Sequence, residues 1–234
     1  MSSTNRGNDR DPLDDYPSPR WTVYRLLERR PLPGGLWYEP CAGAGNIIRA
    51  VDQVRMDVRW IANELNPKYV PELEVLKAKG YPIELITTEP AQDLVVGPGV
   101  SVAISNPAFT PSADILIKLL VGAPGALPVL LQRIGWGGGP RSELFRHLKP
   151  SVYQIPQRPS FKDIVSVNPK TGKKQTSSQD STEYAWWVFD GLGKFEILDD
   201  TPDDVIKAEK AERRAAEAAM QRALAEWKMS GCES

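Results

Sequence analysis

Short apolar runs alternate with longer amphipathic segments along the first half of the chain, and this alternation is the main indication of the fold. The runs are four to six residues long and carry β-branched and aromatic residues, as strands do. They predict strands at Leu36–Glu39, Val58–Asn63, Ile83–Thr87, Val100–Ser105 and Leu127–Gln132. The amphipathic segments predict helices at Pro19–Arg30, Gly45–Val54, Pro67–Lys79, Ser112–Val121 and Pro140–His147. Strands that alternate with helices predict a mostly parallel sheet with helices on both faces.

Two later apolar runs, Val152–Ile155 and Tyr184–Phe189, predict an antiparallel pair of strands joined by a mobile polar loop at Asn168–Ser181. The expected fold class is therefore α/β, with a Rossmann-like sheet of seven mostly parallel strands. Asp203–Met229 predicts a long, charged, alanine-rich C-terminal helix. Its narrow apolar stripe is expected to pack on the domain, with a protein partner or a second copy of the chain as the alternative.

The 234 residues are enough for one sizeable core. We expect a disordered segment at residues 1–15, a single domain at 16–202, the helix at 203–229 and a tail at 230–234. Two cysteines do not suggest a disulfide framework, and no apolar run approaches the roughly 20 residues of a membrane span. The N-terminus also lacks the pattern of a signal peptide. These features predict a cytoplasmic protein without a membrane partner.

The net charge of −1 hides an uneven distribution. Between Arg133 and Lys174 there are nine Lys and Arg residues but only two acids, Glu143 and Asp163. Such a segment favours contacts with phosphate groups, although it also fits an ordinary solvated loop surface.

A glycine-containing motif, Glu39-Pro40-Cys41-Ala42-Gly43-Ala44-Gly45, follows the first predicted strand. Glycines at this place let a nucleoside cofactor approach the backbone near a helix N-terminus, although a tight turn alone also needs glycine. The motif lacks the Gly-Lys-Ser/Thr of a phosphate-binding loop, and Ile48 stands where a dinucleotide fingerprint has its third glycine. Glu39 suits a cation better, such as the amino group and sulfonium of S-adenosylmethionine.

Carboxylates after the next two strands complete this candidate cofactor site. Glu64, at the end of the second strand, is placed to accept hydrogen bonds from both ribose hydroxyls, unless it is only an exposed charge. Glu89 or Asp93, after the third strand, is a candidate acceptor for the adenine amine.

A second motif, Asn106-Pro107-Ala108-Phe109, ends the fourth strand. The exocyclic amine of adenine is a poor nucleophile because its lone pair is delocalised into the ring. The side-chain oxygen of Asn106 and the carbonyl of Pro107 are candidate acceptors that favour a pyramidal nitrogen and aim its lone pair. Phe109 is a candidate stacking partner for the base, although an ordinary strand-end turn explains the same residues.

Together the motifs resemble the class I S-adenosylmethionine-dependent methyltransferases, specifically the phage-type DNA N6-adenine methyltransferase family. The resemblance covers about residues 14–190 and includes Tyr16-Pro17-Ser18-Pro19, which would put Ser18 near the cofactor's carboxylate. It implies that Glu39, Cys41, Gly43, Gly45, Glu64 and Glu89 hold the cofactor. It also implies that Asn106, Pro107 and Phe109 act in catalysis. The chain departs from the family at Ala108, where the family has a second proline.

The resemblance implies DNA as the substrate and the basic segment as its contact, through Arg133, Arg141, Arg158, Phe161 and Lys162. RNA and the amide of a protein glutamine are alternative substrates for the same amine chemistry. A non-catalytic scaffold that binds the cofactor is a further alternative, and Ala108 keeps it open.

Other reactive or aromatic residues are not assigned to the reaction itself. His147 is the only histidine, so a metal site is not expected. Trp186 and Trp187 are interpreted as the core and surface faces of one strand, Cys41 as a small packing residue, and Trp136 as a lid residue.

Overall fold

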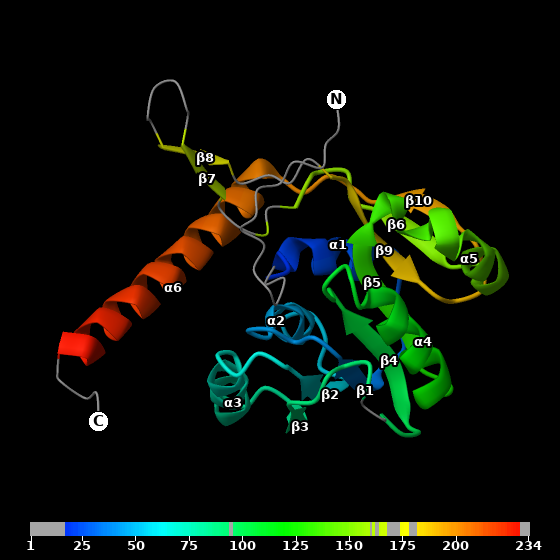
Figure 1. The fold of residues 1–234 in the computed structure, drawn as a ribbon, viewed down its shortest axis with the longest axis horizontal. Helices are drawn as coiled ribbons and strands as arrows, with labels where there is room; N and C mark the ends of the chain where they lie inside the picture. The colour runs from blue at the N-terminus through cyan, green and yellow to red at the C-terminus, as the bar shows by residue number, and fades with distance from the viewer. Residues whose placement is uncertain are drawn as a thin grey trace. The chain divides into compact units, whose positions relative to one another are not determined.

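An eight-stranded mixed sheet organises the chain (Figure 1). The computed structural model describes residues 17–93, 96–159, 161, 164–167, 174–177 and 182–229. The strand order is β10-β6-β9-β5-β4-β1-β2-β3. The strands are Gly35–Glu39 (β1), Val58–Asn63 (β2), Ile83–Thr87 (β3), Val100–Ser105 (β4), Leu127–Arg133 (β5), Ser151–Gln154 (β6), Tyr184–Val188 (β9) and Phe195–Ile197 (β10).

Parallel pairing joins β3, β2, β1, β4 and β5, and β9 then runs antiparallel to both β5 and β6. The expected antiparallel pair of late strands is thus confirmed. β1 lies between β2 and β4, so Tyr38 is paired with Ile61 on one side and with Ala103 on the other. This is the point where strand order reverses, and the sequence places both of its motifs directly after these neighbouring strands.

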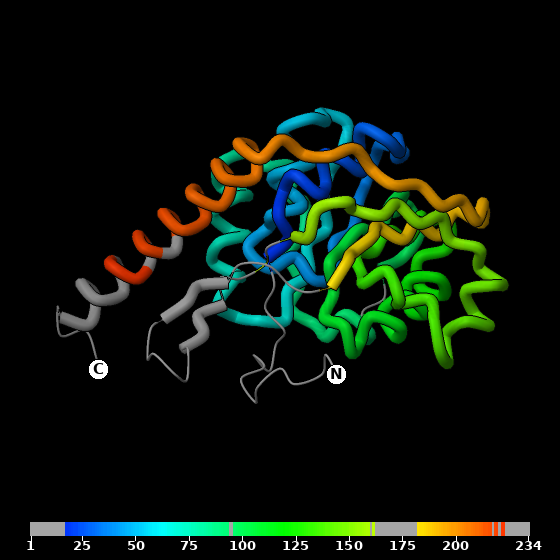
Figure 2. The backbone as a smooth tube through the Cα atoms, turned by 90° about the horizontal axis from the view of Figure 1, so that it is seen from above, coloured from blue at the N-terminus to red at the C-terminus, as the bar shows by residue number. Residues whose placement is uncertain are grey.

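Helices cover both faces of the sheet. They are Arg20–Arg29 (α1), Asn46–Asp52 (α2), Val70–Ala78 (α3), Ser112–Gly122 (α4) and Ser142–Leu148 (α5), with 3-10 turns at Ile134–Gly137 (η1) and Gly139–Arg141 (η2). Figure 2 shows α1 (blue) on one side of the sheet and α4 and α5 (green) on the other. The side chains agree: the indole N–H of Trp186 donates to the Thr22 carbonyl of α1 at 2.9 Å, whereas the next residue, Trp187, packs against Phe145 of α5.

The tryptophans show where the sequence interpretation was wrong. Trp187 is buried rather than on the surface, because α5 covers the second face of β9. Trp136 is 1% exposed and makes edge-on ring contacts with Phe145, Trp187 and Phe189. It is therefore a core residue that anchors the loop after β5, and not a lid.

The strands in the structure differ from those that the sequence predicts in two respects. The sheet has eight strands rather than seven, because β10 adds a parallel edge next to β6. The segment expected to be a loop contains Lys174–Ser177 (β8), which pairs antiparallel with Ile164–Val167 (β7). The rest of that expected loop and the N-terminal residues 1–15 lie outside the described residues.

The chain divides into two compact units, residues 1–199 and 200–234. The second unit contains the long helix Asp203–Met229 (α6), with the bounds expected from the sequence. Whether its apolar stripe packs on the domain stays a prediction. In the part of the chain described here, each helix is too short or too polar to cross a bilayer.

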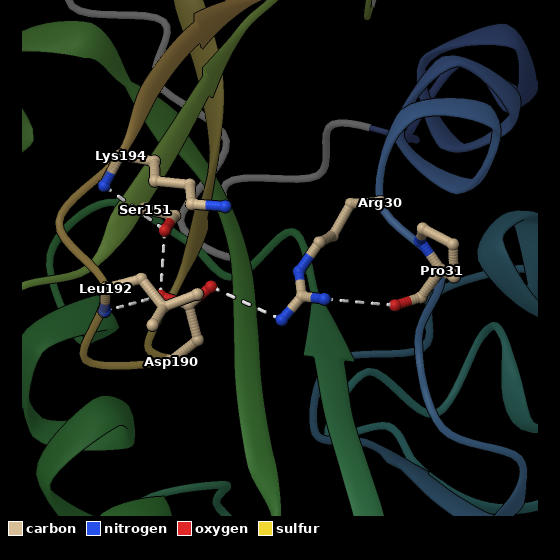
Figure 3. A network of polar contacts seen from close by, with 6 residues as sticks. All are labelled: Arg30, Pro31, Ser151, Asp190, Leu192 and Lys194. Carbon is tan, nitrogen blue, oxygen red and sulfur yellow. Dashed lines mark hydrogen bonds and ion pairs between the residues drawn. The ribbon is translucent and has the colours of Figure 1, made fainter.

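A polar network fastens the antiparallel part of the sheet to the end of α1 (Figure 3). The carboxylate of Asp190, just after β9, accepts hydrogen bonds from Ser151 Oγ at 2.8 Å and Leu192 N at 3.1 Å. It also pairs with Arg30 at 3.3 Å. The Asp190 side chain is only 6% exposed, so each donor compensates for the lost hydration of the charge.

We expect Asp190→Asn to lower the free energy of unfolding by about 1–3 kcal/mol, since it removes the charge and leaves one donor without an acceptor. Urea unfolding followed by circular dichroism measures the change. Glu84→Gln is the matched control, because it breaks the exposed Arg59–Glu84 pair and should cost less than about 1 kcal/mol. Equal losses in the two variants would show that the network contributes no more than a surface pair.

Candidate active site

A pocket of about 420 Å³ lies at the carboxyl ends of β1, β2 and β4. The segment before α1, the loops after β1 to β4 and the start of α2 form its walls. The structure brings together most of the residues that the sequence predicts for a cofactor, and adds two residues of the second motif, Asn106 and Ala108; Pro107 and Phe109 of that motif do not line the pocket. The predicted site residues among the lining are Ser18, Glu39, Cys41, Gly43, Glu64 and Asn106.

The Glu39 carboxyl group is buried on the pocket wall, and the described part of the chain gives its Oε2 atom no donor. Its residue is 1% exposed. Burial, and then the nearby charge of Glu64, hold the pKa of Glu39 well above its ordinary value. An orphaned carboxyl on a pocket wall fits a ligand that brings a cation or a hydrogen-bond donor.

Glu64 organises the glycine loop. One of its oxygens accepts from the Gly43 N–H at 2.5 Å, and the other accepts from the Asn66 N–H at 2.7 Å. Glu64 also lines the pocket, so its carboxyl group is on the wall where a ligand would bind. Glu64 therefore holds the loop in place and puts an acceptor at the pocket wall.

The two glycines of the loop serve different purposes. Gly43 has φ +50° and lies on the pocket wall, and a Cβ there would meet no atom within 4 Å. Gly45 has φ +76°, and a Cβ there would lie 2.5 Å from Leu76 Cδ1 on α3. Gly43 thus leaves space for a ligand, whereas Gly45 lets α3 pack against the start of α2.

Cys41 behaves as a packing residue at the pocket wall. Burial, followed by the charges of Glu64 and Glu39, raises the pKa of its thiol to about 12. The thiol is therefore protonated and a poor nucleophile. The described residues also contain no group of three His, Cys, Asp or Glu side chains that could hold a metal ion.

The loop after β3 lines the pocket through other residues than the two that the sequence predicts. Ala91 and Gln92 line the pocket, but Glu89 and Asp93 do not. Glu89 instead uses its backbone: its N–H donates to Asn63 Oδ1 and its carbonyl accepts from Asn63 Nδ2. The structure thus gives Glu89 a part in fixing the loop rather than a place on the pocket wall.

Asn63 is a functional residue that the sequence reasoning missed. Fully buried at the end of β2, it donates to the carbonyls of Pro40 and Glu89, each at 2.9 Å. Its oxygen accepts from Thr87 Oγ1 at 2.8 Å and Glu89 N at 3.2 Å. One side chain therefore joins the ends of β1, β2 and β3, and the only signal in the sequence was an amide at the end of an apolar run.

The second motif follows β4 and stands beside the first. Ser105 Oγ donates to the Cys41 carbonyl at 3.5 Å, which links the two loops, and Asn106 lines the pocket. The Pro107 carbonyl accepts from Gln132 Nε2 at 3.0 Å, a buried contact from β5 that the sequence did not suggest. That carbonyl retains a second lone pair for another donor.

Phe109 and two arginines of the basic segment lie at the mouth of this pocket. The neighbours of Phe109 in sequence, Ala108 and Thr110, line it, while Phe109 itself is 39% exposed and its ring contacts Arg133 and Arg141. Arg158 is exposed. Phe161 is 5% exposed and packs edge-on against Tyr184, so the structure places it in the interior and not at a surface for DNA. Lys162 lies outside the described residues.

Comparison with known proteins identifies the architecture. A protein from Listeria monocytogenes, assigned as a class I S-adenosylmethionine-dependent methyltransferase, superposes with TM-score 0.50 and 10% identity, over 82% of this chain and 67% of that one. A dimethyladenosine transferase from Plasmodium falciparum gives TM-score 0.50 and 14% identity, over 71% and 59% of the two chains. The fold is that of the class I methyltransferases. The expected methyltransferase fold is therefore confirmed. This support comes from structure alone, because no protein-family model and no curated protein sequence matches the chain.

We expect Asn63→Asp to lower the free energy of unfolding by about 2–4 kcal/mol at neutral pH, because a carboxylate then faces two carbonyl oxygens that have lost their donor. Thermal and urea unfolding measure this loss. Asn46→Asp is the matched control, since among the described residues the Asn46 amide donates to one carbonyl, that of Ser18, at 3.2 Å. A loss no larger than that of the control would contradict the structural role of Asn63.

The raised pKa of Glu39 predicts that the stability of the protein depends on pH. Because folding raises the pKa of Glu39, its contribution is fully present below the ordinary carboxyl pKa and is lost as pH rises through the raised value. We expect Glu39→Gln to increase the free energy of unfolding at about pH 8 and to change it little at about pH 4, when no ligand is bound. Urea unfolding across this range measures the effect. Glu74→Gln, at an exposed position of α3, is the control and should follow the wild-type curve; a Glu39→Gln curve parallel to it would refute the prediction.

Proposed function

We propose that this protein transfers a methyl group from S-adenosylmethionine to the N6 amine of adenine in DNA. One observation carries the proposal: parallel pairing of β1 with β4 brings an orphaned buried carboxyl, Glu39, and the amine-accepting motif that starts at Asn106 to the same pocket. The first suits a cationic cofactor and the second suits an amine substrate.

The residues fit S-adenosylmethionine. Glu39 would accept from its amino group, Ser18 lines the same pocket and would donate to its carboxylate, and the Glu64 carboxylate would accept from the ribose hydroxyls. The open space at Gly43 would let the ligand approach the backbone. When bound, this cofactor supplies an electrophilic methyl group on a sulfonium.

The chain's own part in the reaction is to orient the amine. The side-chain oxygen of Asn106 and the Pro107 carbonyl would accept the two amine hydrogens, which directs the nitrogen lone pair away from them. The hydrogen bond from Gln132 fixes the direction of the Pro107 carbonyl before substrate binds. A strong base is unnecessary, because the nitrogen becomes acidic as it is methylated, so catalysis is orientation and exclusion of water.

Adenine is favoured among amine substrates by the exposed ring of Phe109 next to two arginines, a surface suited to a base and its phosphates. The fold neighbour named as a dimethyladenosine transferase adds support at the level of the fold. In duplex DNA the adenine would have to be extruded from the stack to reach the pocket.

We expect Asn106→Ala to lower methyl transfer by about 100-fold or more, since one of the two groups that orient the amine is lost. The assay supplies methyl-labelled S-adenosylmethionine to separate pools of DNA, RNA and cell protein, with digestion to identify N6-methyladenine. Asn106→Asp is the matched control, because it keeps an acceptor oxygen and should retain more activity than the alanine variant. Unfolding curves verify that both variants are folded.

Each outcome separates the candidate functions. N6-methyladenine in DNA that depends on Asn106 supports the proposal. Label confined to RNA or to protein glutamine would show that this molecule, and not DNA, is the substrate. Cofactor binding without any transfer would indicate a scaffold. Label in DNA that Asn106→Ala leaves unchanged would overturn the assigned catalytic residues.

A further inference from the structure

Two arginines from different elements contact the ring of Phe109. Arg133 ends β5 and Arg141 ends η2, and their guanidinium carbons lie 5.0 and 5.7 Å from the ring centroid. Each contact is a cation–π interaction of the kind that holds arginine on an aromatic surface. Because the residues on either side of Phe109 line the pocket, the two cations lie at its mouth.

No carboxylate balances these two charges in the described ranges. Within these ranges, Arg133 and Arg141 form no ion pair. The two arginine side chains make one hydrogen bond to the described residues, from Arg141 Nε to the Trp136 carbonyl at 2.7 Å. Other surface arginines do have acidic partners: Arg59 pairs with Glu84, and Arg29 with Glu196. Two like charges held together without an anion indicate a site for an anionic ligand.

The support for Arg141 is rigid. Its acceptor belongs to Trp136, which is buried among Phe145, Trp187 and Phe189. The neighbouring Gly137 has no room for a side chain, since a Cβ there would lie 2.8 Å from the Phe145 ring. The guanidinium is thus positioned before any ligand arrives, which reduces the entropy lost on binding.

We propose that Arg133 and Arg141 form a clamp for a phosphodiester group of the nucleic acid, next to the target nucleotide, with the Phe109 ring as its support. The clamp rests on the proposed function, since it takes the substrate to be a nucleic acid. Guanidinium groups match the oxygens of phosphate with paired donors. The Glu64 carboxylate on the inner wall repels phosphate, so the phosphodiester stays at the mouth while the uncharged base enters the pocket.

The test is the salt dependence of binding without cofactor. Fluorescence anisotropy measures the affinity of a dye-labelled, adenine-containing single-stranded DNA oligonucleotide between about 50 and 200 mM KCl. A phosphate contact with a single strand contributes about −0.7 to the slope of log affinity against log salt concentration. We expect Arg133→Gln and Arg141→Gln each to reduce the magnitude of the slope by about 0.7, and the double variant by about 1.4.

Arg146→Gln is the matched control. Arg146 is an exposed residue of α5 in the same basic segment, makes no cation–π contact with Phe109, and should leave the slope unchanged. An equal reduction in all three single variants would overturn the clamp in favour of diffuse attraction. Displacement of the oligonucleotide by polyglutamate at an equal charge concentration would overturn it in favour of an acidic protein ligand. An RNA oligonucleotide of the same sequence shows which nucleic acid supplies the phosphate.

The two proposals fail in different ways. Wild-type protein that methylates DNA, with slopes unchanged in Arg133→Gln and Arg141→Gln, refutes the clamp and leaves the proposed function. Protein that shows the expected slopes but transfers no methyl group refutes the proposed function and leaves a phosphodiester site.

Discussion

The candidate active site depends on the parallel pairing of β1 with β4. These strands are far apart in the sequence, and each ends in a motif that an ordinary turn could explain. Their register, with Tyr38 opposite Ala103, puts Glu39 and Asn106 within a few residues of the same sheet edge. A shift of one residue would turn every side chain of one strand to the other face of the sheet. The buried side chains on both faces of β1, Trp37 and Tyr38, therefore fix the site as well as the core.

Buried amides then convert this arrangement of strands into a defined pocket. Loop backbones at the edge of a sheet have no ladder to satisfy their N–H and C=O groups, and leaving them unpaired in the interior is costly. Asn63 satisfies such groups in the loops after β1 and β3, and Gln132 does so for Pro107. The amides supply both donors and acceptors without bringing a charge next to Glu39 and Glu64.

Much of the fold could be predicted because burial leaves a pattern in the sequence. Val58–Asn63, Ile83–Thr87 and Val100–Ser105 match the observed strands residue for residue, and the site motifs follow from the rule that ligands bind where strand order reverses. β10 was missed because it is only three residues long, and the single alternation Phe195-Glu196-Ile197 is too short a pattern to indicate a strand. Asn63 and Gln132 were missed because a polar residue near a strand end has the same appearance whether it faces water or a buried carbonyl.

The charges of the site explain why it need not be the most stable part of the protein. The charge of Glu64 raises the cost of ionising Glu39 inside the pocket, and Arg133 and Arg141 bring two like charges to the Phe109 ring at its mouth. The like charges of each pair oppose folding of the ligand-free protein, and the hydrogen bonds of Glu64 and the cation–π contacts of the arginines offset part of that cost. A cation would relieve the inner pair and a phosphate the outer pair. The acidic groups lie inside the pocket and the basic groups at its mouth, and this arrangement also sets how the ligands are oriented. A phosphate that entered the pocket would be repelled, and so would a sulfonium held at the mouth.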